Sequence, residues 1–161
     1  MAREVLEFED AKIIFRNFEG RQQKFNPLGK RNFCLVLNEN DVEDFIREGW
    51  NVKETKPREE GDPIKHYVKI NVNMESKNPP KIYMIAGRHK TELTADTVKE
   101  LDYASIKQLD IVVSPWKWHT DDGGEGISGY LQTLYAEIIQ DSFADKWNAI
   151  GEEEEEEVPF N

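Results

Sequence analysis

The sequence predicts a mostly β protein, folded as a small closed antiparallel barrel with two short helices and long loops. Three observations lead to this prediction. About six or seven segments are rich in β-branched and aromatic residues. Turn-forming Gly, Pro and Asn residues separate these segments, and a length of 161 residues suits one domain. A β-sandwich is the alternative architecture.

The N-terminal part contains two expected strands. Residues 1–10, with one Arg and four acidic residues, are expected to form a flexible N-terminus. Residues 11–16 (Ala-Lys-Ile-Ile-Phe-Arg) and residues 32–37 have the β-branched or apolar composition of strands. The folded domain is therefore expected to span residues 11–150.

A short helix is expected after the second strand. Asn40 can cap its N-terminus, Glu43 can complete a capping box, and Gly49 can end it. The spacing of three apolar residues predicts its buried stripe: Val42, Phe45 and Ile46.

The next expected strands are residues 50–55 and 66–74. A charged loop containing Pro and Gly, residues 56–63, separates them. In the first strand, Trp50 and Val52 share one face. The second strand alternates between polar and apolar residues, and its apolar face consists of Val68, Ile70 and Val72.

The C-terminal half has two more expected strands, residues 81–86 and 109–118, and a second short helix that Thr94 caps. Residues 129–139 fit both a helical stripe and the returning arm of a hairpin. We predict a strand, because a glycine-rich turn at residues 121–126 precedes it. A curved barrel of the OB-fold type, with extra strands attached, fits the length.

Charge is distributed unevenly along the chain. The net charge is -11, but residues 12–90 carry 16 basic and 11 acidic groups. Residues 91–150 carry 4 basic and 11 acidic groups, and residues 152–157 are six consecutive Glu. A basic half, an acidic half and an acidic tail form the asymmetry that indicates a nucleic-acid face.

Several classes of protein are disfavoured. No apolar run is long enough to cross a bilayer and no apolar signal region is present, so a cytoplasmic protein is expected. Cys34, the only cysteine, excludes a disulfide framework and a cysteine-based zinc site. Walker and Gly-x-Ser-x-Gly motifs are absent, and the three His are scattered. We expect no enzyme, cofactor or metal; a magnesium nuclease using Asp110 and Asp121 is the catalytic alternative.

Residues 16–33, the basic loop, have the most distinctive composition. Five of them are Lys or Arg, three are Phe, and only Glu19 is acidic. Cations for phosphates and rings for base faces suit a single-stranded nucleic acid. The alternative is a solvated loop tip with Phe18 and Phe33 in the core.

Candidate binding residues extend beyond the basic loop. The candidate phosphate ligands are Arg16, Arg21, Lys24, Lys30, Arg31, Lys53, Lys56, Arg58 and Lys69. The alternative, an ordinary surface cation, suits Lys53 and Lys69 best. The candidate stacking rings are Phe18, Phe25, Trp50, Tyr67, Trp116 and Trp118, followed by Phe33, Tyr130 and Tyr135. About half of these rings are expected to serve the core instead. Phe25 is the least suited to the core, and the two indoles of residues 115–118 are either core or a two-base platform.

Residues 151–161 are expected to be a disordered acidic tail, because six adjacent negative charges repel one another. The tail ends in an apolar tip that suits a protein-interaction motif: Val158, Pro159 and Phe160. The alternative is an incidental solvated end.

Several motifs occur in order over residues 12–140. They are Arg-Asn-Phe at 16–18, Lys-Phe-Asn-Pro-x-Gly-x-Arg-Asn-Phe at 24–33, Gly-Trp-Asn-Val-Lys at 49–53, Pro-Arg-Glu-Glu-Gly-Asp at 57–62, Pro-Pro-Lys-Ile at 79–82, Leu-Asp at 101–102, Pro-Trp-Lys-Trp at 115–118 and Gly-Tyr-Leu at 129–131. This series resembles a family of bacteriophage single-stranded DNA-binding proteins. The resemblance implies an OB-fold barrel that coats single strands during phage DNA replication or recombination.

The tail is similar to the acidic tail of bacterial single-stranded DNA-binding proteins, which ends in Pro-Phe and recruits replication and repair enzymes. Asn161 follows Phe160 here, so the terminal carboxylate is not on the Phe. The expected function is sequence-independent binding of single-stranded DNA in the host cytoplasm, with tail-bound partner proteins and oligomers possible. The alternative is an acidic adaptor or DNA-mimic inhibitor that binds a basic host protein.

Overall fold

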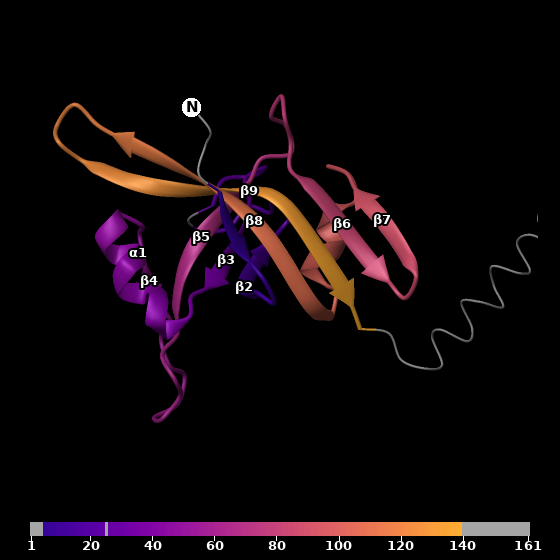
Figure 1. Cartoon of the computed structure of the whole chain (residues 1–161), viewed down its shortest axis with the longest axis horizontal. Coiled ribbons are helices and arrows are strands. Elements are labelled where there is room, and N and C mark those ends of the chain that lie inside the picture. The colour runs from indigo at the N-terminus through magenta and orange to yellow at the C-terminus, as the bar shows by residue number, and fades with distance from the viewer. Residues whose placement is uncertain (1–4, 25, 140–161) are drawn as a thin grey trace, which may run out of the picture.

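The computed structural model describes residues 5–24 and 26–139. One sheet of nine strands dominates it (Figure 1). The strands are β1 (Leu6–Phe8), β2 (Lys12–Asn17), β3 (Arg31–Val36), β4 (Lys53–Glu54), β5 (His66–Val72), β6 (Lys81–Ala86), β7 (His89–Leu93), β8 (Ile106–His119) and β9 (Glu125–Ile138). The helical elements are the 3-10 helices η1 (Glu39–Asp41) and η2 (Val98–Asp102) and the helix α1 (Val42–Glu48).

The long antiparallel hairpin of β8 and β9 is the spine of the sheet. β1 pairs with the outer edge of β8, and β9 pairs in parallel with both β5 and β6. From β5 the sheet continues antiparallel to β3 and then β2, while β4 flanks β5 and β7 flanks β6. The prediction of a mostly β protein is confirmed, and the two parallel pairings depart from the expected antiparallel arrangement.

The predicted closure of the barrel is not confirmed. Within the described residues, the path of paired strands runs from β1 to β2 and does not return on itself. Ala11, just before β2, donates a backbone hydrogen bond of 2.7 Å to the carbonyl oxygen of Leu109 in β8. The sheet therefore curves enough to bring β2 near β8 without a strand ladder between them.

The core lies on the inner face of this curved sheet. The alternation predicted for β5 is confirmed, because Val68, Ile70 and Val72 are buried. Tyr67 and Lys69 lie between them on the opposite side, which we call the outer face. The inner face packs together residues from every major strand, among them Phe33, Leu35, Ile82, Leu109, Ile111, Val113, Leu131 and Leu134.

Two N-terminal predictions need correction. Leu6–Phe8 form β1 rather than a flexible start, because these residues pair with Val113–Ile111 of β8. Asn38, not Asn40, caps the helical segment, its side chain accepting a hydrogen bond from the Asn40 N–H. Gly49 ends α1 as expected, with a φ of 113° that favours glycine.

Further differences concern exposure and element length. Ile46, predicted to be buried, is 57% exposed on α1. The strand expected at residues 50–55 is reduced to β4. The second helix is the 3-10 element η2, whose N-cap is Thr97 rather than Thr94. β7 begins at His89, so residues 87 and 88 alone form the turn between β6 and β7. The ambiguous segment 129–139 lies almost entirely in β9, which confirms the strand prediction.

The end of the β8–β9 hairpin projects beyond the rest of the sheet (Figure 1). We call residues 115–128 the arm. α1 lies beside it, and the Ile127 N–H donates a 3.1 Å hydrogen bond to the Gly49 carbonyl. No helix within residues 5–24 and 26–139 has the length and apolar character to span a membrane.

Candidate nucleic-acid interface

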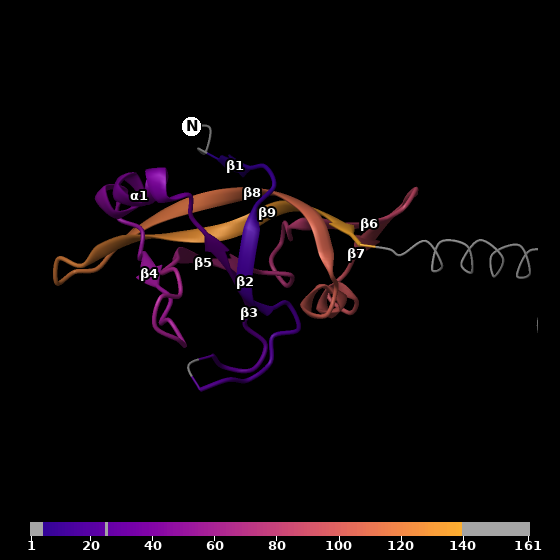
Figure 2. The same ribbon diagram turned by 90° about the horizontal axis from the view of Figure 1, so that it is seen from below.

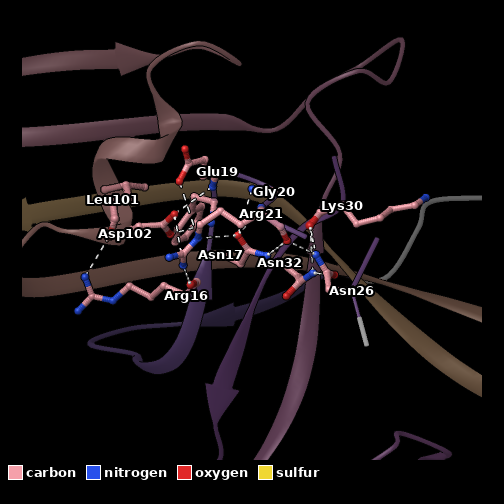
Figure 3. A network of polar contacts seen from close by, with 11 residues as sticks. Arg16, Asn17, Glu19, Gly20, Arg21, Asn26, Lys30, Asn32, Leu101 and Asp102 are labelled. Carbon is pink, nitrogen blue, oxygen red and sulfur yellow. Dashed lines mark hydrogen bonds and ion pairs between the residues drawn. The ribbon is translucent and has the colours of Figure 1, made fainter. Parts of the chain in front are cut away.

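Three buried asparagines hold the basic loop in one conformation (Figure 3). The Asn17 carboxamide oxygen accepts hydrogen bonds from the Gly20 and Arg21 N–H groups, at 3.1 and 2.8 Å. The Asn26 side chain donates to the Arg21 and Lys30 carbonyls, each at 3.0 Å. Asn32 donates to the Asn26 side chain at 2.8 Å. Side chains thus satisfy the loop backbone in the absence of a strand ladder.

The arginines of the basic loop make structural contacts. The Arg16 guanidinium donates to the carbonyls of Leu101 and Ala104, at 3.0 and 2.6 Å. Arg21 donates to the Arg16 carbonyl at 3.1 Å and lies 4.0 Å from the Asp102 carboxylate. These contacts tie β2 and the basic loop to the segment around η2.

The Asp102 carboxylate, only 2% exposed, completes this attachment. It accepts hydrogen bonds from the Phe18 and Glu19 N–H groups, at 2.7 and 3.1 Å.

Arg31 is 13% exposed, pairs with Glu75 at 2.7 Å and donates to the Ala95 carbonyl. Arg16, Arg21 and Arg31, predicted as phosphate ligands, therefore all make structural contacts, and among their donors the Arg31 Nε is buried without a hydrogen-bond partner. Their role in binding phosphate stays a prediction.

Three of the predicted stacking rings belong to the core: Phe18, Phe33 and Trp50. Phe18 is 0% exposed and stacks on Phe33, with centroids 5.2 Å apart and planes at 23°. Trp50 is 6% exposed and packs against Phe45 at 5.3 Å. Phe18 and Phe33 are enclosed and Trp50 is nearly so, which makes all three residues parts of the core.

Phe15 is an exposed ring that the sequence pattern did not identify as a binding residue. It is 61% exposed, and its φ of 52° is in the left-handed region that bulky residues avoid. The pairing of β2 with β3 shifts register between Ile14 and Asn17, and this bulge re-aims the side chain outward. Phe15 meets Tyr67 edge to face, with centroids 5.4 Å apart. Strained exposed aromatics of this kind are characteristic of functional sites.

A groove of about 340 Å³, the lysine groove, surrounds this ring pair. Lys53 lies opposite Tyr67 across the β4–β5 pair, and Lys69 is two residues further along β5, so all three share the outer face. The remaining lining comes from the basic loop and β3: Gln23, Lys24, Asn26, Asn32 and Cys34. Burial raises the pKa of the Cys34 thiol, while Lys53 and Lys69 act in the opposite direction. Burial also raises the pKa of Tyr67, which keeps its hydroxyl protonated.

A second group of rings follows the outer face of β8 and β9. Trp116 and Trp118 are 50% and 42% exposed, and Tyr130 and Tyr135 are 40% and 39% exposed. An extra residue, Gln132, interrupts β9 between its pairings with Val113 and Val112, and so restores both tyrosines to one face. We call these four rings the aromatic stripe. The exposure of the two indoles of residues 115–118 shows that they are not core, a point that the sequence left open.

The lysine groove and the aromatic stripe lie on one continuous face. Asn71, on the outer face of β5, pairs in register with Tyr130 of β9 and donates a hydrogen bond of 3.2 Å to the Gly129 carbonyl. At the far end, Tyr83 stacks on Tyr135 with centroids 5.1 Å apart. The Lys90 ammonium lies 4.3 Å from the Tyr83 centroid, in a cation–π contact.

The other predicted residues are scattered. Lys30, Lys56 and Arg58 are exposed on loops outside the lining of the lysine groove. Phe25 and the tail residues Val158, Pro159 and Phe160 lie outside the described residues. Sequence reasoning missed Phe15 and Tyr83, which stand in ordinary-looking strands. The only available signal was their aromatic character.

The described residues give no support to the metal-dependent nuclease alternative. Residues 5–24 and 26–139 contain no group of three or more His, Cys, Asp or Glu side chains that could hold a metal ion. Asp110 accepts a hydrogen bond of 2.9 Å from the Asp10 N–H, which links β8 to the turn before β2. This hydrogen bond gives Asp110 a structural role, which accounts for the carboxylate without a catalytic function.

The fold is similar to that of the single-stranded DNA-binding protein from bacteriophage Enc34. The structure of that protein in complex with single-stranded DNA gives a TM-score of 0.54 at 10% sequence identity, covering 86% of this chain and 89% of that chain. A second Enc34 structure gives a TM-score of 0.52 at 13% identity, covering 86% and 83%. A search of curated proteins found no match.

The sequence also matches a family model, described as "Putative phage ssDNA-binding domain", over residues 1–160. The match extends over almost the whole chain, and the function of the family is binding rather than catalysis. It agrees with the family resemblance that the sequence motifs indicated. The chain therefore belongs to the phage single-stranded DNA-binding domain family.

Proposed function

We propose that this protein binds single-stranded DNA without reading its sequence, along the outer face of the sheet. The observation that carries the proposal is the lysine groove, where a strained, exposed Phe15 meets Tyr67 between Lys53 and Lys69. Rings beside cations match the two parts of a nucleotide. A ring stacks on the base, and an ammonium group neutralises the phosphate.

The path of the strand follows from the arrangement of the rings. From the lysine groove, the outer face leads through Asn71 to Tyr130 and on to Trp116 and Trp118 on the arm. Every base has a π face, so stacking on these rings tolerates any sequence. Hydrogen bonds to base edges, which would give specificity, are not needed in this arrangement.

The phosphates have a different set of partners. Lys24, Lys53 and Lys69 line the lysine groove, and Lys56 and Arg58 extend from the loop that follows β4. Long flexible ammonium side chains suit a backbone whose phosphates are not at fixed positions. We assign Arg16, Arg21 and Arg31 to supporting the groove rather than to binding phosphate.

The proposal has three further parts, which concern the type of fold, the biological process and the acidic tail. The curved sheet is a variant of the OB-fold in which the barrel is left open. The protein coats single strands during phage DNA replication or recombination in the host cytoplasm. The acidic tail at residues 151–161, with Val158, Pro159 and Phe160 at its tip, recruits partner proteins of that process.

A fluorescence titration tests the binding proposal. Trp116 and Trp118 are half exposed on the proposed path, whereas Trp50 is buried, so bound DNA should quench the tryptophan emission substantially. Oligo(dT) should quench at low salt, and a duplex of equal length should quench much less. Trp116→Phe and Trp118→Phe should together remove most of the quenching. Absence of both quenching and a gel shift at low salt would rule out the proposal.

A further inference from the structure

The side of the molecule around α1 carries a strongly acidic surface, which we call the acidic lobe. Five exposed carboxylates lie on η1 and α1, and three more lie near the tip of the arm. They are Glu39, Asp41, Glu43, Asp44, Glu48, Asp121, Asp122 and Glu125. The basic residues of the same segments are Arg47, which pairs with Asp44 at 2.6 Å, and Lys117.

An apolar groove opens within the acidic lobe, between β1, the end of α1 and the arm. We call it the arm groove, and its volume is about 530 Å³. Its walls are mostly apolar, with Glu48 and Lys117 as the charged members: Leu6, Glu48, Trp50, Pro115, Trp116, Lys117 and Ile127. An apolar groove beside an acidic surface fits a protein segment with an apolar side chain flanked by cations.

The basic loop of the same chain has this chemistry. Leu28 is 77% exposed, more than any other large hydrophobic residue of the part that the structure describes. Lys24 and Lys30 lie on either side of it in the sequence. Figure 3 shows the Lys30 side chain extending away from the asparagine network. Leu28 and Lys30 are not among the residues that line the lysine groove.

The basic loop presents Leu28 on a fixed support. Leu28 follows Pro27 in a turn that a 3.3 Å hydrogen bond from the Lys30 N–H to the Pro27 carbonyl closes. Gly29 occupies a φ of 91° and donates a 2.8 Å hydrogen bond to the Gly20 carbonyl. Because the turn is already formed, docking Leu28 costs little conformational entropy.

The two surfaces face different sides of the molecule. Figure 2 shows α1 and the basic loop on opposite sides of the sheet. A molecule can therefore offer its basic loop to one neighbour and its arm groove to another. A contact between two different patches is heterologous, and when it does not close into a ring it produces chains.

We propose that copies of this protein associate head to tail, with Leu28 of one copy in the arm groove of the next and Lys30 facing the acidic lobe. Each contact joins surfaces of opposite charge and buries an otherwise exposed leucine. The consequence for DNA, which rests on the proposed function, is cooperative coverage of long strands. A bound copy places the next copy beside it on the same strand.

Charge reversal in the full-length chain tests the contact. Sedimentation velocity of the parent at low salt should show association that grows with concentration and weakens with added salt. Lys30→Glu and Glu48→Lys should each weaken association at least about tenfold, because like charges then face each other. The matched controls are Lys77→Glu and Glu100→Lys, exposed positions outside both surfaces, which should associate like the parent.

Mixing the two variants is the most specific test. The intact basic loop of Glu48→Lys fits the intact lobe of Lys30→Glu, and the two reversed charges also attract each other, so the mixture should associate although neither variant does so alone. The double variant Lys30→Glu/Glu48→Lys should associate again into chains. A monomeric parent at all concentrations, or single variants that associate like the parent, would overturn the proposal.

DNA measurements separate this proposal from the proposed function. Leu28→Ser should bind an oligo(dT) that accommodates one copy with unchanged affinity, but should lose cooperativity on long poly(dT). Cooperativity that persists in Leu28→Ser contradicts the contact while leaving DNA binding itself intact. Failure of the parent to bind even the short oligomer would count against the proposed function instead.

Discussion

The arginines of the basic loop and the lysines of the outer face carry the same charge but have different neighbours. Arg16 meets the carbonyls of Leu101 and Ala104, whereas Lys53 and Lys69 extend from strands beside exposed rings. A guanidinium has five donors in a rigid fork and can tie several carbonyls together. The difference teaches that composition identifies a cationic region, while the surrounding acceptors determine which cations are available to a ligand.

The same contrast holds for two phenylalanines three residues apart. Phe18 is fully buried against Phe33, and Phe15 is mostly exposed beside Tyr67. The bulge in β2 decides which ring faces outward, because it reverses the direction that strict alternation gives to both positions. Substitutions at the two positions should therefore have opposite signatures.

Phe18→Ala should have the largest effect on stability. Truncating a fully buried Phe typically costs about 3–5 kcal/mol, from lost burial and the cavity left behind. Urea denaturation should report this loss. The folded fraction should bind oligo(dT) with an affinity close to that of the parent. A large affinity loss without a stability loss would return Phe18 to the binding site.

Lys53→Ala/Lys69→Ala should weaken DNA binding and make it less dependent on salt, because two phosphate contacts are lost. Each lost phosphate contact removes about 0.7 from the slope of log affinity against log salt, so the slope should shrink by about 1.4. At 0.1 M salt this corresponds to roughly a 25-fold loss of affinity. Arg16→Ala is the matched comparison and should lower thermal stability while leaving the slope unchanged. Equal slopes for the lysine variant and the parent would remove both lysines from the interface.

His66 should give the smallest effect, a pH dependence of stability. Hydrogen bonds to the carboxylates of Glu39 and Glu54, at 3.1 and 3.2 Å, raise the pKa of His66. Because the folded pKa is raised, the stabilisation is fully present below the unfolded value of about 6.5 and is lost as the pH rises through the folded pKa. The difference in melting temperature between the parent and His66→Asn should therefore be larger at pH 6 than at pH 8.

A Glu39→Gln/Glu54→Gln background provides the control for this effect. Without the two carboxylates, the His66→Asn difference should no longer change between pH 6 and pH 8. A difference that grows with pH would contradict the assigned hydrogen bonds.

Much of the fold could be predicted from local periodicity in the sequence. The alternation in β5 placed Val68 and Ile70 inside and Lys69 outside, because the side-chain period of a strand is a local property. Gly49 marked the end of α1 for a similar reason, since its φ of 113° suits glycine. Barrel closure was not predictable, because it depends on whether β2 and β8 come into register, which no local pattern specifies.

The candidate site was less predictable than the fold. Tyr67, Lys53 and the two arm indoles were identified, because polar and aromatic residues on strand faces are visible in sequence. Phe15 was missed, since a bulge reverses the direction that strict alternation gives it. The structural contacts of the arginines were not predictable because their acceptors are distant in sequence, with Arg16 bound to residues 85 and 88 positions away.

The affinity of Phe15→Ala for oligo(dT), measured together with its unfolding free energy, tests the central claim most directly. Stacking of one base on a ring contributes about 1–3 kcal/mol, so affinity should fall roughly 5- to 150-fold, while stability changes by less than about 0.5 kcal/mol. Phe15→Tyr should keep the affinity of the parent, because it keeps the ring. Unchanged affinity in Phe15→Ala, or a stability loss comparable to that of Phe18→Ala, would contradict the assignment of the lysine groove as the DNA-binding site.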